Sequence, residues 1–348
     1  MEYANLGNSG LKVSKVILGA MSFGSSKWFD WVIDDEKEVF KLLKHAYDSG
    51  LRTWDTANVY SSGESERLIG RFLKEYNIPR SSIVLMTKCY VYTEDEPSLE
   101  KDPFKQVNRM GLSRKHIFDA IDKSLERLGV DYVDVYQIHR HDPDTPKDET
   151  MKALDDLVKS GKVRYIGASA MRAVEFAQYQ FAAEKNGGTK FISMQDYYNL
   201  VYREEEREMI PFCKSTGVGI IPYSPVARGF LTRPVGSEAN SVRAKTDPVV
   251  KGATSAPTLV KVKPYFVGTS EAHKTIARRV EEIANKRGTS MACVAIAWSL
   301  AKGAMPIVGF NKVERIDEAI SAISLKLTDQ EVEYLEEPYE PQDIQGYA

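Results

Sequence analysis

The sequence predicts a (β/α)8 TIM barrel that is preceded by an N-terminal β-hairpin and carries a long loop after its seventh strand. Two observations support this class. Eight short apolar runs alternate with amphipathic stretches of helical spacing along the 348 residues, a pattern that requires parallel strands joined by crossovers. Eight such units are also the number that closes into a barrel. An open doubly wound sheet is the structural alternative, but no G-x-G-x-x-G sequence follows any of the runs.

The expected elements follow one another in a regular order. Asn8, Ser9 and Gly10 separate two extended stretches and therefore predict the turn of a hairpin. The apolar runs expected to form strands cover residues 16–20, 52–56, 83–88, 133–139, 163–169, 191–195, 218–224 and 305–310. Apolar residues at helical spacing, with Gly closing several stretches, predict amphipathic helices between the strands. These stretches include residues 35–50, 113–129, 150–161 and 313–323.

Residues 225–270 interrupt this order. The segment is rich in Pro, Gly, Ser and Lys and carries little periodicity. A long irregular segment inside a compact domain is usually functional or disordered, so we expect a loop over the mouth of the barrel. Because α/β barrels routinely reach this length as one domain, residues 1–348 are expected to form a single domain.

Composition restricts the partner and the compartment. Lys and Arg number 47 against 49 Asp and Glu, so the chain has no global field that would attract nucleic acid or an anionic membrane. A small-molecule partner is therefore expected.

Cys89, Cys213 and Cys293 form no C-x-x-C sequence, which argues against a disulfide framework or a zinc site. Neither a secretory leader nor an apolar run of about 18 residues is visible. We expect a cytoplasmic protein, and its oligomeric state stays open.

Polar residues follow the ends of three consecutive predicted strands, where barrels build their active sites. The second strand ends at Asp55 and leads through a short loop to Tyr60, Lys88 ends the third and His139 ends the fourth. Each residue alone has an ordinary explanation as a loop cap, a packed ring, a strand end or a buried imidazole. Together they can transfer a proton, because a lysine ammonium beside a tyrosine favours the phenolate and lowers its pKa of about 10. A carboxylate can hold the lysine, and an imidazole can orient a carbonyl or relay the proton.

Several ordered motifs resemble a known family. "DTANVY", "SSGESERLIG", "MTK", "QIHRHD" and "YSPVARG" are similar to signature segments of the aldo-keto reductase superfamily, especially its fungal aryl-alcohol dehydrogenase-like members. The resemblance runs from "LGNSGLKVS" to "PIVGFNKVERIDEAI". It implies a barrel reductase that uses NADPH, in which Tyr60 is the general acid for carbonyl reduction. Asp55 and Lys88 would tune this tyrosine, and His139 would align the carbonyl for hydride attack.

The resemblance also implies contacts to the nicotinamide end of the cofactor. Ser169 and Gln195 would hold the carboxamide, Tyr223 would stack on the ring, and residues 224–229 would track the pyrophosphate. Ala170 stands where many relatives have Asn. The implied cofactor-binding residues of this end are Gly19, Met21, Asp55, Ser169, Gln195, Tyr223, Ser224, Pro225, Val226, Arg228 and Gly229.

At the adenine end, "GFNKVERIDEA" resembles the segment that grips the 2′-phosphate and the base. Lys312 and Arg315 would supply positive charge and Glu318 would face the base, with Gly309 beside them. Two cations near the start of a helix form a reasonable phosphate site, because helix N-termini also favour anions. From spacing alone a solvated helix face is an equal alternative. Ala319 stands where relatives often have Asn.

Aromatic residues indicate a substrate pocket, because their rings offer large apolar area at low entropic cost. Trp28, in the loop after the first strand, is the best candidate, and Trp31 is a weaker one. Trp298 lies in an almost wholly apolar helical stretch and is expected in the core. The implied substrate-binding set is Trp28, Tyr60, His139 and Arg140.

Two other functions are alternatives. The "HRHD" cluster could indicate a metal-dependent hydrolase, since such enzymes also place His and Asp at strand ends. However, only five histidines exist, and His45, His116 and His273 fall in helical patterns, which leaves His139 and His141. The second alternative is a non-catalytic, NADPH-binding redox-sensing subunit of the same fold.

Overall fold

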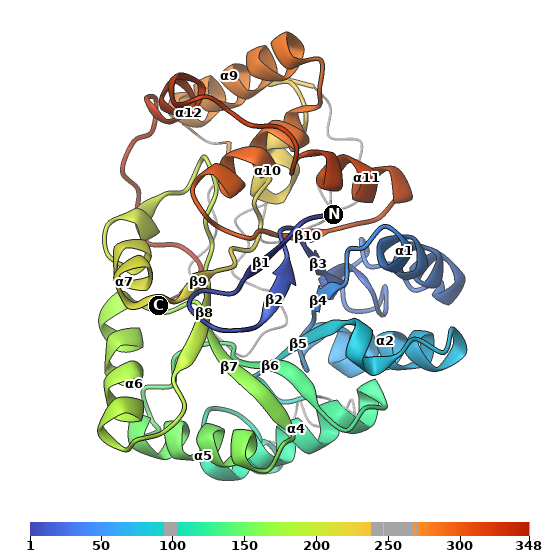
Figure 1. Ribbon diagram of the computed structural model, residues 1–348, viewed down its shortest axis with the longest axis vertical. Coiled ribbons are helices and arrows are strands. Elements are labelled where there is room, and N and C mark those ends of the chain that lie inside the picture. Colours follow the sequence, from blue (N-terminus) through green and yellow to red (C-terminus); the bar gives the residue numbers. More distant parts are fainter. Residues whose placement is uncertain (94–102, 238–245, 247–266, 269, 348) are drawn as a thin grey trace.

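Eight parallel strands form one sheet around a common axis (Figure 1). The computed structural model describes the chain except residues 94–102, 238–245, 247–266, 269 and 348. The strands are β3 (Ile17–Gly19), β4 (Thr53–Asp55), β5 (Val84–Cys89), β6 (Val133–Ile138), β7 (Val163–Ser169), β8 (Phe191–Gln195), β9 (Gly219–Ile220) and β10 (Ile307–Gly309). Their order in the sheet is β10-β3-β4-β5-β6-β7-β8-β9. All neighbours are parallel, so the predicted strand-and-crossover arrangement is confirmed.

Hydrogen bonds between the seventh and eighth strands close the barrel. The backbone N–H of Met305 donates to the carbonyl of Ile220 at 2.9 Å, and the N–H of Ile307 donates to that of Pro222 at 2.8 Å. These bonds join the two ends of the sheet, which decides against the open alternative. β9 covers only Gly219–Ile220 of the predicted run, and Tyr223 pairs further along with Tyr197 and Ile307 as isolated bridges.

The N-terminal hairpin covers one end of the barrel (Figure 1). It consists of β1 (Tyr3–Asn5) and β2 (Lys12–Ser14), which pair antiparallel around the predicted turn. Leu6 and Val13 pack with Ile17 and Met86 in a small cluster of buried side chains. The N–H of Ser14 donates to Oγ1 of Thr53 at 2.9 Å and ties the hairpin to β4. The hairpin thus closes the amino ends of the strands and leaves their carboxyl ends for a site.

Helices surround the sheet at the predicted positions (Figure 1). They are α1 (Glu36–Asp48), α2 (Glu64–Glu75), α3 (Pro103–Gln106), α4 (Arg114–Leu128), α5 (Lys147–Lys159), α6 (Ala173–Lys185), α7 (Met209–Thr216), α9 (Glu271–Arg287), α10 (Met291–Ala301), α11 (Val313–Ser321) and α12 (Asp329–Glu336). In α4, Oγ of Ser113 accepts from the N–H of His116, and Gly129 ends the helix at a φ of 63°.

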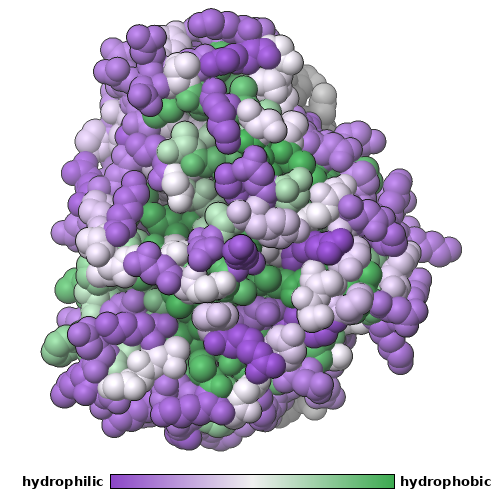
Figure 2. Space-filling model, viewed as in Figure 1, coloured by the Kyte–Doolittle hydropathy of each residue, from purple (hydrophilic) through white to green (hydrophobic). Residues whose placement is uncertain are grey.

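Hydrophilic side chains cover most of the face in Figure 2. Within the described part of the chain, none of the helices combines the length and the hydropathy that a membrane crossing requires.

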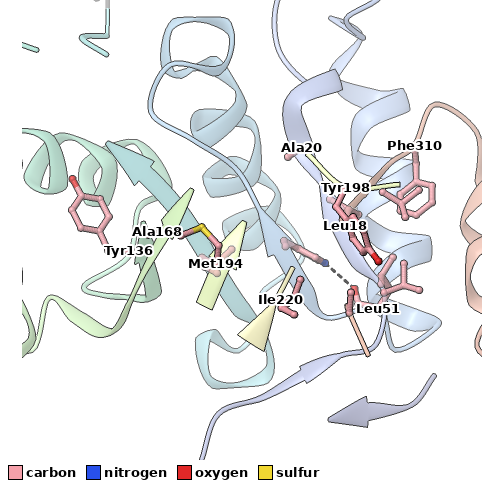
Figure 3. Close-up of a cluster of buried hydrophobic side chains, with 14 of the residues drawn as sticks. Leu18, Ala20, Leu51, Tyr136, Ala168, Met194, Tyr198, Ile220 and Phe310 are labelled. Carbon is pink, nitrogen blue, oxygen red and sulfur yellow. Dashed lines mark hydrogen bonds between the residues drawn. The ribbon is translucent and has the colours of Figure 1, made fainter. Parts of the chain in front are cut away.

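The main hydrophobic core lies between the sheet and the helices. Outward side chains of four neighbouring strands, including Tyr136 and Met194, contribute to it (Figure 3). The indole N–H of Trp54 donates to the carbonyl of Leu51 at 2.8 Å, so this buried ring keeps a hydrogen bond. Trp298 in α10 is fully buried, which confirms its predicted place in the core. The three cysteines are buried and free.

The predicted long loop after the seventh strand is described only in part. Its beginning contains a 3-10 segment, η6 (Ala227–Thr232). Residues 238–245, 247–266 and 269, which make up most of the loop, lie outside the described residues.

Candidate active site

Lys88 brings the predicted residues together at the carboxyl ends of the strands. Its Nζ donates to Oδ2 of Asp55 at 2.5 Å, to the carbonyl of Thr56 at 2.8 Å and to the hydroxyl oxygen of Tyr60 at 3.3 Å. The Lys88 side chain is fully buried and that of Asp55 is 2% exposed. Tyr60, which opens the 3-10 segment η2 (Tyr60–Gly63), is partly exposed at this mouth. A buried ammonium is therefore held between a carboxylate and a phenol.

Burial and neighbouring charges set the protonation of this group. Burial alone lowers the pKa of Lys88, but Asp55 and Tyr60 raise it above its ordinary value, so the amine stays charged. Burial raises the pKa of Tyr60, and this effect exceeds the lowering by Lys88. The sequence-based expectation of a lowered tyrosine pKa is therefore wrong for the net value, although the effect of Lys88 has the expected sign. Tyr60 stays protonated near neutral pH and can donate its proton.

His139 lies directly after β6, beside the tyrosine. Its backbone N–H donates to the carbonyl of Cys89 at 2.9 Å, and its ring centroid lies 6.0 Å from that of Tyr60. Burial, Arg140 and Lys88 hold the pKa of His139 well below its ordinary value. The imidazole is therefore neutral. Its Nδ1 is buried and has no hydrogen-bond partner among the described residues.

Gln137 belongs to the site, and the sequence analysis did not identify it. Its Nε2 donates to Oδ1 of Asp55 at 2.9 Å, and Nε2 of Gln195 donates to the same oxygen at 3.1 Å and to Oε1 of Gln137 at 3.0 Å. Asp55 thus meets one cation and two amides. The available signal was strand alternation, because Val135 and Gln137 face the barrel interior and only Gln137 is polar.

Aromatic rings of the loop after β3 lie beside the tyrosine. The ring centroids of Trp28 and Tyr60 are 6.1 Å apart, so the predicted substrate residue is next to the predicted proton donor. Phe29 contacts Trp28 at 4.5 Å and stacks on Trp31 at 5.3 Å. Phe29 was not anticipated, and it links both predicted tryptophans into one aromatic wall.

Comparison with known proteins agrees with this geometry. The Aldo/keto reductase family matches residues 15–340. A versiconal hemiacetal acetate reductase of Aspergillus parasiticus is 53% identical over 352 residues, which cover 99% of this chain and 98% of that protein.

The chain belongs to the aldo/keto reductase family.

Other fungal relatives support the same grouping. A Schizosaccharomyces pombe protein that carries the name putative aryl-alcohol dehydrogenase is 52% identical, with 99% of this chain and 97% of that protein covered. An aldo-keto reductase of Alternaria alternata is 48% identical, with 99% and 94% covered. The resemblance to fungal aryl-alcohol dehydrogenase-like members is therefore confirmed. The chain is an oxidoreductase of a family that typically uses NAD(P)H.

In this aldo-keto reductase, several residues expected at the nicotinamide end lie side by side. Gly19 pairs with Asp55 on one side and with Gly309 on the other. The close packing at Gly19 requires a residue without a side chain, because a Cβ at this position would lie only 2.8 Å from Cγ2 of Ile307. Met21 follows in the 3-10 segment η1 (Ala20–Ser22) and is partly exposed.

The expected carboxamide partners are already engaged with one another. Oγ of Ser169 donates to the backbone carbonyl of Gln195 at 2.7 Å. Both amide hydrogens of Gln195 are used by Asp55 and Gln137, so its Oε1 is the atom that can meet a carboxamide N–H. Ala170 adopts a φ of 45°, in the left-handed region. Alanine tolerates this conformation poorly, because it has a Cβ and lacks the polar side chain with which Asn can form a local hydrogen bond.

Tyr223 and the segment after it form a strained edge of the mouth. The Tyr223 ring lies 5.7 Å from that of Tyr197, which in turn lies 4.8 Å from that of Tyr202. Ser224 and Arg228 have φ values of 56° and 54°, which L residues rarely adopt. Pro225, Val226 and Gly229 complete this expected pyrophosphate segment.

The expected adenine-end residues lie at the start of α11. Lys312 precedes the helix and is exposed. Nη1 of Arg315 lies 2.7 Å from Oε2 of Glu318, so the expected phosphate and base residues pair with each other. Ala319 is 1% exposed and belongs to the core, which gives this position a packing role.

The remaining polar residues of "HRHD" have protein partners. Nη1 of Arg140 donates to the carbonyl of His139 at 2.9 Å. Nδ1 of His141 lies 3.1 Å from the hydroxyl of Tyr179, and its Nε2 lies 3.8 Å from Oε1 of Glu175. Across the described residues, no group of three or more His, Cys, Asp and Glu side chains is arranged to hold a metal ion.

Proposed function

We propose that this protein reduces aldehydes or ketones to alcohols, with a hydride from NADPH and a proton from Tyr60. The contact of Lys88 with both Asp55 and Tyr60 carries this proposal. A structural ion pair would not need a phenol at its solvent-facing end. A proton donor needs that arrangement, because the phenolate left after transfer is stabilised by the adjacent ammonium.

Each residue of the site has a separate part in the reaction. When bound, the nicotinamide cofactor would supply the hydride for the carbonyl carbon. Tyr60 gives its hydroxyl proton to the carbonyl oxygen, and Lys88 stabilises the resulting phenolate. Asp55 keeps Lys88 charged and in place, while neutral His139 can orient the carbonyl oxygen by a hydrogen bond. General acid catalysis of this kind typically contributes on the order of 10² to 10⁴ in rate.

The residues at the mouth fit a nicotinamide dinucleotide. Oε1 of Gln195 can accept from the carboxamide, and the Tyr223 ring offers a stacking surface. Backbone at positive φ, such as Ser224 and Arg228, is strained and clusters at ligand-binding sites. The preference for NADPH rests on Lys312 and Arg315, whose charges suit a 2′-phosphate.

We also propose a single domain over residues 1–348, because strands from both ends of the chain pair in one barrel. A cytoplasmic location is supported by the three buried, free thiols, which suit a reducing compartment. Its partner is a small carbonyl compound, and the aromatic wall of Trp28, Phe29 and Trp31 favours substrates with an apolar group.

Steady-state oxidation of NADPH with a panel of aromatic and aliphatic aldehydes and ketones tests this function. We expect turnover with at least one class of aldehyde, and slower turnover with NADH. The alcohol product must appear in amounts equal to the NADPH consumed. If NADPH binds tightly but no member of the panel is reduced, the proposal is wrong and the non-catalytic redox-sensing subunit is favoured.

A further inference from the structure

We propose that Glu66 is a positioning residue that sets the separation of Lys88 and Tyr60 from outside the barrel. It does so with Thr87 and Arg127, and we call these three residues the Glu66 network. The inference rests on the proposed function, since it concerns the same proton donor. None of the three residues contacts the mouth through the hydrogen bonds described below, so their effect would be indirect.

The first part of the network fixes the strand that carries Lys88. Oγ1 of Thr87 donates to Oε1 of Glu66 at 2.6 Å, and both side chains are fully buried. Thr87 directly precedes Lys88 in β5. Side chains alternate along a strand, so Thr87 faces the helices where Lys88 faces the barrel interior. The carboxylate of Glu66 in α2 therefore holds β5 one residue away from the ammonium.

The second part fixes the turn that begins at Tyr60. Nε of Arg127 in α4 donates to Oε2 of Glu66 at 2.7 Å. The same arginine packs under Gly63, because a Cβ on that glycine would lie 2.6 Å from Cδ of Arg127. Gly63 ends η2, the segment that Tyr60 opens, and has a φ of 86°. Arg127 thus supports the far end of this turn.

The turn needs support because its backbone is strained. Ser61 and Ser62 have φ values of 48° and 53°, so left-handed residues follow directly after Tyr60. Such conformations persist only where the surroundings enforce them, and they occur often at functional sites. Ser65, at the start of the same helix, donates to the carbonyl of Ala20 at 2.8 Å. The start of α2 is therefore attached on two sides.

A purely structural role is the competing explanation. Removing both charges of a buried ion pair can be neutral for stability, so burial of Glu66 and Arg127 at 0% and 4% is weak evidence for a stabilising purpose. What distinguishes this pair is its attachment. The carboxylate of Glu66 connects the strand that carries Lys88 with the arginine that supports the turn of Tyr60. Nζ of Lys88 and the hydroxyl oxygen of Tyr60 are 3.3 Å apart.

The same strand offers a matched control at its other end. Oδ2 of Asp134 accepts from Nη2 of Arg80 at 2.6 Å and from the backbone N–H of Leu85 at 2.8 Å. Asp134 thus links an arginine with β5 as Glu66 does. It acts near the amino end of the strand, away from Lys88. Asp134→Asn removes a comparable charge without touching the turn.

The experiment compares Glu66→Gln and Thr87→Val with Asp134→Asn in the full chain. We expect both network variants to lower kcat by about tenfold or more, since small misplacements of catalytic groups have large effects on rate. KM for NADPH should stay within about twofold of the parent value. Lys88 lowers the pKa of Tyr60, so its displacement should move the alkaline fall of kcat to higher pH. Asp134→Asn should change neither kcat nor the pH profile.

Hydrogen exchange supplies a measurement that does not depend on turnover. We expect the amides of residues 60–66 to exchange faster in both network variants than in the parent and in Asp134→Asn. Thr87→Val keeps the ion pair and tests the idea if Glu66→Gln does not fold. Parental kcat, pH profile and exchange in folded Thr87→Val would overturn the inference and leave the proposed function intact. A parent without reductase activity would overturn the proposed function, while the exchange result would still decide whether the network holds the turn.

Discussion

Asp55 shows how single residues set the chemistry of this site. Its carboxylate accepts from Lys88, Gln137 and Gln195, so one buried charge is balanced by an ammonium and two amides. The positions of Asp55 and Lys88 were predictable, because strand ends converge at the mouth of a barrel. Gln137 was not predicted, because a single amide inside an apolar run gives no signal of its partner.

Replacing Gln137 with Leu should weaken the site without emptying it. Asp55 would lose one of its hydrogen-bond donors, and the side-chain amide of Gln195 would lose Oε1 of Gln137 as an acceptor. Unpaired buried polar groups cost about 1 to 3 kcal/mol each, so urea unfolding should show a loss of that order. We expect a lower kcat as Asp55 and Lys88 become less fixed. A variant with parental stability and kcat would show that the amide is dispensable.

Arg315→Ala should reduce the preference for NADPH over NADH. One charge-assisted hydrogen bond to the 2′-phosphate is worth about 1.5 to 3 kcal/mol, which corresponds to roughly tenfold or more in KM for NADPH. KM for NADH should hardly change. Lys286→Ala, in the exposed last turn of α9, is the control and should leave both values as they are. Unchanged cofactor preference in Arg315→Ala would remove this residue from the phosphate site.

At the scale of elements, most strands and helices were predictable and their local exceptions were not. β7 and β8 have the predicted bounds, because each apolar run coincides with a buried strand. The left-handed turn at Ser61 and Ser62 could not be predicted, since serine has no intrinsic preference for it and packing imposes it. The net pKa of Tyr60 was missed for a related reason, because burial is a property of the assembled elements.

The segment after β8 carries two buried carboxyl groups. Oδ1 of Asp196 accepts from the N–H of Ala170 at 3.1 Å, and burial raises the pKa of Asp196 to about 7 against the lowering by Ala170 and Arg140. Burial and Asp196 also hold the pKa of Glu205 well above its ordinary value. Because the pKa of Asp196 is higher in the folded protein than in the unfolded chain, its contribution to stability is fully present below about pH 4, near the pKa of the unfolded chain. This contribution is lost as the pH rises through about 7, the pKa in the folded protein.

Asp196→Asn should therefore flatten the pH dependence of stability. Asn keeps an oxygen for Ala170 but cannot ionise. Urea unfolding of the parent should show a free energy that falls from pH 5 to pH 8 by an amount on the order of a few kcal/mol. The variant should lose much less over this range. An equal loss in both proteins would assign the pH dependence to other groups.

In the whole molecule, the N-terminal hairpin and the candidate active site lie at opposite ends of the barrel. The hairpin packs Leu6 and Val13 into the amino ends of the strands, while Asp55, Tyr60, Lys88 and His139 lie at their carboxyl ends. The barrel itself was predictable from eight alternating units, because their number limits the closed arrangements. The fit of the hairpin was not, since it depends on contacts between segments distant in sequence, such as Ser14 with Thr53.

Leu6→Ala should lower stability and leave the reaction largely unchanged. Truncating a fully buried leucine typically costs about 2 to 5 kcal/mol, because it leaves a cavity. We expect a lower midpoint of thermal unfolding and a nearly parental kcat at a temperature where the variant is folded. Val174→Ala, at an exposed position of α6, is the control and should change neither quantity. A folded Leu6→Ala protein with much lower kcat would show that the two ends are coupled.

Tyr60→Phe tests the central claim most directly. The variant removes only the hydroxyl group that contacts Lys88. We predict that kcat for aldehyde reduction falls on the order of 10² to 10⁴-fold, because the proton donor is lost, while the dissociation constant of NADPH stays within about twofold of the parent value. Both quantities are measured on the same folded protein by stopped-flow oxidation of NADPH and by cofactor titration. Reduction at the parental rate would contradict the assignment of Tyr60 as the proton donor.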